Sequence, residues 1–418
     1  MKRRIIPLLM TVICLLESSL SSHGEDTINF EIIKTYSFVK LKENYIHNEE
    51  FLNNTFEKLF QQRANNNKII NILHIGDSHL QADFITNIIR TTLQYNFGNA
   101  GRGLIVPLRV ARTNEPFNYL SSSPCYWQSK RCVFPDQPLP IGIGGVTISN
   151  DTVNSFLNLK IFDSKSLTYS FNKISLFYLK DSSSFDFNIK DSIGNEIGYI
   201  NSSSQSDYSN VNTINLTNSI NQISIKTIKT NNIQTHAVIF GISLMNSNNG
   251  VLYNTVGVNG AQFKHYSKSQ YFCEQTKVLA PDLIVISLGT NEANDSKLDE
   301  DIFYREIESL VFNLKRQNPH SEFLLTTPAD SYYQKNKFNP RMSLVASTLI
   351  CFAKENNIAY WDLQSITGGK NSAYSWKKYN LLRLDGVHYT QDGYKLQGNL
   401  FCKAFLNAYN SYVSDRTK

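Results

Sequence analysis

Short apolar runs alternate with amphipathic segments near the start of the chain. The run from Asn71 to Ile75 is rich in β-branched residues and ends at Gly76-Asp77-Ser78, a pattern typical of a buried strand followed by a turn. Apolar residues then recur at helical spacing over 80–95, which predicts a helix there. Ser78 is thus predicted at the carboxyl end of a strand and just before a helix, the edge where ligands bind in open α/β sheets.

The alternation of apolar runs and amphipathic segments returns in the last part of the chain. The pattern predicts strands over 251–258, 283–288, 322–326 and 358–362. It predicts helices over 261–278, 301–316, 340–355 and 390–412, and one more over 48–62 before the first strand. Strands alternating with helices favour a doubly wound parallel sheet, an α/β fold with helices on both faces.

The middle of the chain has a different pattern. Short runs alternate apolar and polar residues between clusters of Asn, Ser and Gly, at 156–161, 174–178, 185–189, 223–228 and 237–242. This pattern predicts an antiparallel β-sandwich. We therefore expect an inserted domain over 116–249, between a first part (25–115) and a second part (250–418) of the α/β domain. Such a domain is suited to holding an extended substrate such as a glycan.

Residues 1–24 have the pattern of a cleaved secretory signal peptide. Lys2-Arg3-Arg4 precedes an apolar segment over 5–16, and Ser19-Leu20-Ser21 supplies small residues for cleavage. The apolar segment is too short to span a bilayer, which takes about 20 residues. We predict a periplasmic or secreted protein without stable membrane insertion.

Composition narrows the function classes. Of 418 residues, 41% are hydrophobic and 18% charged, which suits a folded globular protein. The net charge of +6 comes with no dense basic block after the leader, so nucleic-acid binding is not expected. Cys125 and Cys132 are spaced to close a small disulfide loop, and they match no zinc-binding pattern. No cofactor or metal is predicted, and the sequence leaves the oligomeric state open.

Five residues follow predicted strands at the same sheet edge: Ser78, Gly260, Asn291, Asp385 and His388. Each suits one task of ester hydrolysis. A serine hydroxyl needs a base to take its proton, and histidine is the usual one. An aspartate can hold the other ring nitrogen and stabilise the imidazolium. The backbone N–H groups of Ser78 and Gly260 and the Asn291 amide are candidate donors to an oxyanion.

Four blocks containing these residues resemble those of the SGNH (GDSL-type) hydrolase family, in the same order. They are Gly76-Asp77-Ser78-His79, Asn259-Gly260-Ala261, Gly289-Thr290-Asn291-Glu292 and Asp385-Gly386-Val387-His388. The first block departs from the usual pattern, because His79 stands where the family has leucine. The resemblance implies Ser78 as nucleophile, His388 and Asp385 as its triad partners, and an oxyanion hole from Ser78, Gly260 and Asn291.

The longer string over 74–83 resembles the branch that contains peptidoglycan O-acetylesterases, which carry an inserted β-sandwich module of the carbohydrate-binding type. That branch implies removal of acetyl groups from O-acetylated glycan in the periplasm, with peptidoglycan as the expected substrate.

The sequence leaves several site residues and alternative functions undecided. Gly257 is an alternative to Gly260 as the oxyanion glycine. Candidate substrate contacts are His79, Gln81, Arg102, Glu292, Trp376 and Arg383. The same triad would also serve a glycan O-acetyltransferase, and a catalytically idle glycan-binding protein is a further alternative. A metal-dependent phosphoesterase using Asp77, His79, Asn291 and His388 is another, although the chain has only eight histidines.

Overall fold

A sheet of five parallel strands forms the centre of the α/β domain. The computed structural model describes residues 36–134, 139–202, 210–334 and 337–416, and the predicted signal peptide lies outside these residues. The strand order is β13-β1-β14-β15-β18, and each neighbouring pair is parallel. The strands are β1 (Ile69–Gly76), β13 (Gly250–Gly257), β14 (Leu283–Ser287), β15 (Glu322–Thr326) and β18 (Ala359–Trp361).

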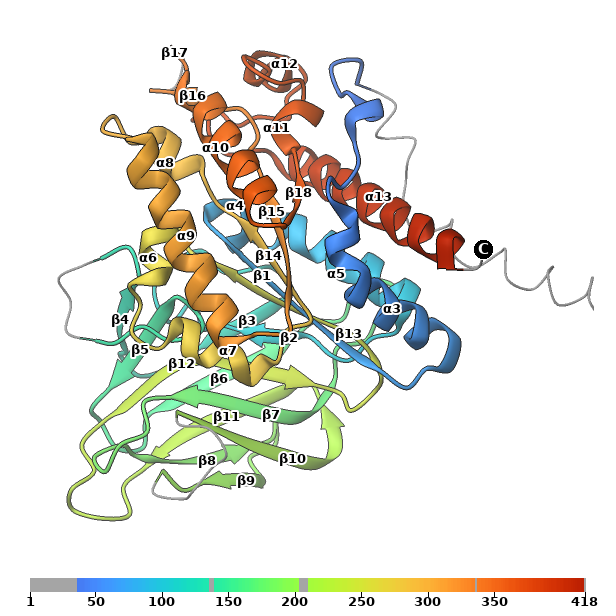
Figure 1. Ribbon diagram of the computed structural model, residues 1–418. Helices are drawn as coiled ribbons and strands as arrows, with labels where there is room; N and C mark the ends of the chain where they lie inside the picture. The colour runs from blue at the N-terminus through green and yellow to red at the C-terminus, as the bar shows by residue number, and fades with distance from the viewer. Residues whose placement is uncertain (1–35, 135–138, 203–209, 335–336, 417–418) are drawn as a thin grey trace, which may run out of the picture.

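Helices cover both faces of this sheet (Figure 1). Alternate residues of β1 enter different cores, with Ile70 and Ile72 on one face and Leu73 and Ile75 on the other, as the period of two in a strand requires. The first face is covered by α3 (Asn53–Asn65), α5 (Phe84–Phe97) and α13 (Gln391–Arg416). The second face is covered by α6 (Phe263–Ser267), α7 (Phe272–Leu279), α9 (Glu300–Gln317) and α10 (Arg341–Glu355).

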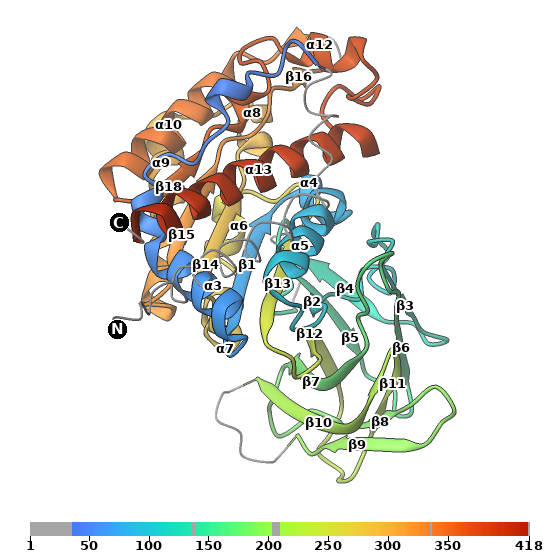
Figure 2. The same ribbon diagram turned by 90° about the vertical axis from the view of Figure 1, so that its right-hand side faces the viewer.

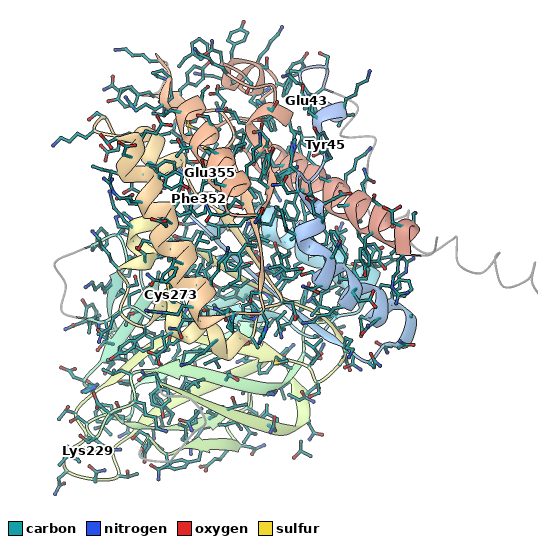
Figure 3. The ribbon with its side chains drawn as sticks, in the orientation of Figure 1. Glu43, Tyr45, Lys229, Cys273, Phe352 and Glu355 are labelled. Atoms are coloured by element: carbon teal, nitrogen blue, oxygen red, sulfur yellow. The ribbon has the colours of Figure 1, made fainter. Side chains whose placement is uncertain are left out.

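Short helices lie in the connections between the longer elements. They are η1 (Leu41–Glu43), η2 (Glu49–Leu52), α4 (Ser78–Gln81), α8 (Thr290–Asn294), α11 (Leu363–Ile366) and α12 (Ala373–Lys378). On the second face, Phe352 of α10 packs edge-on against Tyr304 of α9, with ring centroids 5.3 Å apart (Figure 3). A small hairpin of β16 (Tyr332–Tyr333) and β17 (Lys337–Phe338) follows β15.

Two antiparallel sheets make up the rest of the molecule and are called the β module here (Figure 2). One sheet has the order β10-β7-β12-β5-β4, with β2 (Gly103–Ile105) also paired to β12. Its strands are β4 (Gln128–Arg131), β5 (Val146–Asn150), β7 (Phe171–Tyr178), β10 (Val211–Ile220) and β12 (Ala237–Met245). The other, in the order β3-β6-β11-β8-β9, contains β3 (Tyr119–Ser122), β6 (Phe156–Ile161), β8 (Asp186–Lys190), β9 (Glu196–Ile200) and β11 (Gln222–Ile228).

The β module shares a continuous apolar core with one face of the parallel sheet. Phe240 and Ile242 of β12 belong to the same buried cluster as Ile75 of β1 and Val256 of β13. The predicted fold class, an α/β sheet with an additional antiparallel β-sandwich, is confirmed.

Two predicted helices are each divided in two. The segment 80–95 is broken at Asp83, whose φ of 59° lies in the left-handed region, so α4 ends at Gln81 and α5 begins at Phe84. The Asp83 carboxylate accepts hydrogen bonds from Arg90 and Arg102, and these bonds fix the break. The segment 261–278 likewise forms α6 and α7.

The described cysteines carry free thiols, Cys125 and Cys132 included, so the disulfide loop considered from the sequence is not formed. Burial raises the pKa of Cys273 (Figure 3) and of Cys402 to about 12, which disfavours the thiolate and a nucleophilic role for either. No helix within the described ranges combines the length and apolar character needed to span a bilayer.

Candidate active site

Ser78 stands where β1 ends and the short helix α4 begins. Asp77 precedes it as the N-cap, and its Oδ1 accepts from the His79 N–H at 2.9 Å. Gly76 is required at this turn, since a Cβ there would lie 2.5 Å from the Leu80 side chain and 2.9 Å from the Ser287 carbonyl oxygen. Strand, glycine and cap therefore hold Ser78 at the carboxyl edge of the sheet, as the sequence predicts.

The structure brings Ser78, His388 and Asp385 into one hydrogen-bonded chain. His388 Nε2 lies 2.9 Å from Ser78 Oγ, and His388 Nδ1 lies 3.2 Å from Asp385 Oδ2. The loop is closed by the Arg383 N–H, which donates to the His388 carbonyl at 2.7 Å. Gly386 turns this loop with a φ of 77°. Nucleophile, base and orienting carboxylate thus have the arrangement of a serine-hydrolase triad.

Asp385 is held as a carboxylate. Partial burial raises its pKa, but hydrogen bonds from the backbone N–H groups of His388 and Val387 and from the His388 ring outweigh this and lower the pKa overall. An ionised Asp385 orients the His388 ring and stabilises the imidazolium formed when Ser78 loses its proton.

His79 lies beside the triad as a neutral ring. Burial, and then the neighbouring His388, lower the pKa of His79 to about 3. Its Nδ1 hydrogen-bonds to the Tyr394 hydroxyl at 3.0 Å, and its ring centroid is 5.5 Å from that of His388. A neutral ring at this distance adds no positive charge that would oppose protonation of His388. Tyr394 was not predicted from the sequence, because nothing in its helical context distinguishes it from a core tyrosine.

The candidate oxyanion donors lie on the turns that follow the neighbouring strands β1, β13 and β14. Within the part of the chain that the structure describes, the N–H groups of Ser78 and Gly260 donate no hydrogen bond. Asn291, in α8 after β14, donates from Nδ2 to the Ala261 carbonyl at 2.9 Å and to Asp77 Oδ2 at 3.3 Å. The longer of these two bonds is the weaker, so that hydrogen is the one available to an oxyanion.

The geometry separates Gly260 from Gly257. Gly260 is exposed and has a φ of 82°, and a Cβ built on it meets only Val133, at 3.9 Å. Gly257 is instead pressed against α4, where a Cβ would lie 2.5 Å from the Gln81 backbone nitrogen. Gly260 presents its backbone to open space, whereas Gly257 serves close packing.

Two buried carboxyl groups, those of Asp77 and Glu292, belong to residues next to Asn291 in space or in sequence. Burial raises the pKa of Asp77 to about 7 and that of Glu292 to about 8. Glu292 Oε1 accepts from the Phe263 N–H at 2.8 Å, and its Oε2 is buried with no hydrogen-bond partner. A neutral Glu292 therefore supports the start of α6 without placing a negative charge next to Asn291.

Replacing Glu292 with glutamine is expected to remove a pH dependence of stability. The pKa of Glu292 rises from 4.5 to about 8 on folding, so its contribution to stability is full below pH 4.5 and is lost as pH rises through about 8. Glutamine mimics the neutral acid and does not ionise. The Tm advantage of Glu292→Gln over the wild type should therefore grow from about pH 5 to 9.

Glu308→Gln, on an exposed position of α9, controls for the loss of one negative charge. If the Tm curves of wild type and Glu292→Gln stay parallel across this range, Glu292 is not held neutral in the folded protein.

Four of the six candidate substrate contacts are buried, and for these the prediction is corrected. Gln81, Arg102 and Glu292 are each 2% exposed and Trp376 is 0% exposed. The Trp376 indole N–H donates to the Thr367 carbonyl at 2.9 Å, and its ring packs edge-on against Tyr389, next to His388. Trp376 packs against the loop that carries His388 and does not border an acyl pocket.

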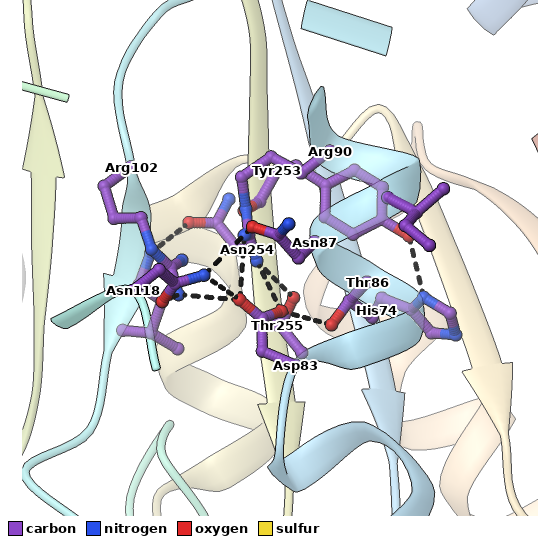
Figure 4. Close-up of polar contacts among 12 residues, drawn as sticks. His74, Asp83, Thr86, Asn87, Arg90, Arg102, Asn118, Tyr253, Asn254 and Thr255 are labelled. Atoms are coloured by element: carbon purple, nitrogen blue, oxygen red, sulfur yellow. Dashed lines mark hydrogen bonds and ion pairs between the residues drawn. The ribbon is translucent and has the colours of Figure 1, made fainter. Parts of the chain in front are cut away.

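Arg102 belongs to a buried polar network (Figure 4). Its Nη2 donates to Asp83 Oδ2 at 3.0 Å and to Asn118 Oδ1 at 2.9 Å, and Arg90 pairs with the same carboxylate. Its position after a glycine-rich turn suggested a ligand contact, but the side chain joins α5 to the β module. Of the candidate contacts, the exposed Arg383 and the partly exposed His79 remain at the site.

In the ranges that the structure describes, no three His, Cys, Asp or Glu side chains are grouped so that they would hold a metal ion.

A family model described as GDSL-like lipase/acylhydrolase matches residues 180–401, which is more than half of the chain. The chain belongs to this family. It is a carboxylic ester hydrolase, as GDSL-type acylhydrolases are. The matched segment contains Gly260, Asn291, Asp385 and His388. Ser78 lies before this segment in the sequence, and also before the strands of the β module. The fold places β1 between β13 and β14, the strands that precede Gly260 and Asn291.

One solved structure shares the fold of this GDSL-type hydrolase. A peptidoglycan O-acetylesterase structure is 21% identical and has a TM-score of 0.71, with 85% of this chain and 96% of that chain covered. A lipase/acylhydrolase from Enterococcus faecalis (20% identity, 38% and 77% covered) and a family two carbohydrate esterase from Cellvibrio japonicus (10%, 70% and 99%) each have a TM-score of 0.30. No curated protein matched by sequence.

Proposed function

We propose that this hydrolase removes O-acetyl groups from a glycan through an acetyl-enzyme on Ser78. The hydrogen-bonded chain from Ser78 Oγ through His388 to Asp385 is the observation that carries this proposal. Ser78 Oγ attacks the acetyl carbonyl carbon while His388 Nε2 takes the hydroxyl proton. The carbonyl oxygen becomes an oxyanion facing the N–H groups of Ser78 and Gly260 and the Asn291 amide.

Collapse of the tetrahedral intermediate breaks the bond to the sugar oxygen, which leaves with the proton held by His388. Water then attacks the acetyl-Ser78 carbonyl as His388 takes one of its protons. The second intermediate collapses to acetate, and the proton returns to Ser78 Oγ. Each cycle consumes one ester and one water and gives one acetate, one proton and one free sugar hydroxyl.

Peptidoglycan outside the cytoplasm is the proposed substrate. The likeness to the peptidoglycan O-acetylesterase structure covers 85% of this chain, so it extends over both the parallel sheet and the β module. The leader pattern of residues 1–24 supports export to the compartment where such a polymer is found. A β-sandwich fused to an esterase sheet also suits an extended polymer better than a small ester.

The substrate proposal is tested by acetate release from O-acetylated peptidoglycan. We expect kcat/KM per acetyl group to be at least about tenfold higher on peptidoglycan than on acetylated xylan, because remote binding energy favours the matched polymer. Base-deacetylated peptidoglycan and the Ser78→Ala variant serve as blanks. Faster release from xylan would contradict the polymer assignment alone. Transfer of the acetyl group to an added glycan, with no free acetate, would contradict hydrolysis.

A further inference from the structure

Gln81 ties the serine turn to the turn that carries Gly260. It is the last residue of α4, three positions after Ser78, and its side chain is buried. Gln81 Oε1 accepts from the Asn259 N–H at 2.7 Å. Its Nε2 lies 2.9 Å from Thr113 Oγ1 and 2.8 Å from both the carbonyl oxygen and Oδ1 of Asn114. One amide therefore joins three segments that are far apart in sequence.

Asn114 completes this connection. Its Oδ1 also accepts from Asn259 Nδ2 at 2.6 Å, so Gln81, Asn114 and Asn259 form a closed set of hydrogen bonds. Asn114 lies on the loop between β2 and β3, both of which are paired within the β module. The module thus reaches the edge of the active site through a loop held by Gln81.

The Gly260 turn is closed by the Ala261 N–H, which donates to the Val258 carbonyl at 2.9 Å, but Gly260 itself is loosely packed. Gly260 is exposed, and a Cβ placed on it meets only Val133, at 3.9 Å. Asn259, the residue that Gln81 holds, directly precedes Gly260, so the peptide that carries the Gly260 N–H begins at Asn259. With little packing around the glycine, the hydrogen bonds to Asn259 act together with the bonds of Ala261 to set where this N–H points.

We propose that Gln81 is a positioning residue for the oxyanion hole, which orients the Gly260 N–H and carries the influence of the Asn114 loop to it. This inference rests on the proposed ester hydrolysis at Ser78. Gln81 touches neither the substrate nor the reacting atoms. It acts on the transition state, because a donor shifted by about 1 Å loses most of its effect on a developing charge while ground-state binding changes little.

The test compares Gln81→Met with Gln94→Met on a small aryl acetate. Methionine fills a similar volume without hydrogen bonds. Gln94 is a matched control, since it is also buried and its amide donates to the Gly101 and Val251 carbonyls at 2.8 and 3.0 Å, away from the site. We expect Gln81→Met to lower kcat by about 10- to 100-fold with KM within about twofold. Gln94→Met should lose stability and keep kcat.

Two further readouts separate positioning from general destabilisation. Gln81→Met should weaken binding of a boronic acid that forms a tetrahedral adduct on Ser78 by the same factor as kcat falls. Asn114→Ala, at an exposed position, should lower kcat in the same direction, and Asn114→Asp should restore it because the Oδ1 acceptor is kept.

Equal kcat in Gln81→Met and Gln94→Met, with unchanged boronic acid affinity, would overturn the inference and leave the proposed hydrolysis intact. If Gln81→Met fails to fold, the Asn114 pair decides: equal kcat in Asn114→Ala and Asn114→Asp would overturn it. A wild type with no esterase activity on the aryl acetate would instead contradict the proposed function itself.

Discussion

Ser78→Ala is expected to lower kcat for an aryl acetate by about 10⁴- to 10⁶-fold. The Ser78 hydroxyl hydrogen-bonds to His388 Nε2, and the acetyl group is proposed to be transferred to it. Without it, water would have to attack the ester directly, helped only by the oxyanion donors. Steady-state rates at saturating substrate measure the loss, and near-UV circular dichroism verifies the fold.

His388→Ala provides the matched test of this account. Because nucleophile and base act as one unit, the kcat of the double variant Ser78→Ala/His388→Ala should be at most about tenfold lower than the kcat of either single variant. Additive losses would mean that the two residues act in separate steps. A Ser78→Ala enzyme within tenfold of wild type would show that another residue attacks the ester.

Asn291→Ala is expected to lower kcat by about 10²- to 10³-fold, with KM changed much less. Asn291 is held by its bond to the Ala261 carbonyl, and its second amide hydrogen is only weakly engaged by Asp77 at 3.3 Å. That hydrogen is free to strengthen its interaction when the carbonyl oxygen becomes negative, and the gain exists only in the transition state. Rates and KM on the aryl acetate measure both effects.

Asn294→Ala is the control for this change. Asn294 ends the same short helix α8, and its amide donates back to the Thr290 carbonyl at 3.0 Å. We expect it to keep kcat within about threefold of wild type, since it lies outside the proposed oxyanion hole. A similar loss in both variants would indicate that α8 as a whole, and not the Asn291 amide, is what matters.

Most of the fold and the triad follow from local sequence patterns. Strands β1, β14 and β15 are short, mostly apolar runs bounded by turn residues, so periodicity places them closely. The catalytic candidates follow because carboxyl ends of parallel strands meet at one edge. The rule places Ser78 at that edge, whereas His388 lies on the loop between α12 and α13 and meets Ser78 from there, across a separation of 310 positions.

The pattern of apolar and polar residues does not show which group a polar side chain will hydrogen-bond to in the folded protein. Asp83 breaks the predicted helix because its carboxylate neutralises two buried arginines, Arg90 and Arg102, and the second of these comes from a loop. Loop position alone suggested that Arg102 and Trp376 contact substrate, yet both are buried. Gln81 was expected near the site for the wrong reason, since its role depends on Asn114 and Asn259, which only the fold brings to it.

The most direct test of the central claim is to identify the residue that carries the acetyl group during turnover. Wild-type enzyme is mixed with O-acetylated peptidoglycan fragments, quenched in acid at increasing times, digested and analysed by mass spectrometry. The account predicts an acetyl group on Ser78 that appears before steady-state acetate release and is absent from Ser78→Ala. Acetate released at the full rate with the acetyl group on another residue, or with equal release from Ser78→Ala, would contradict it.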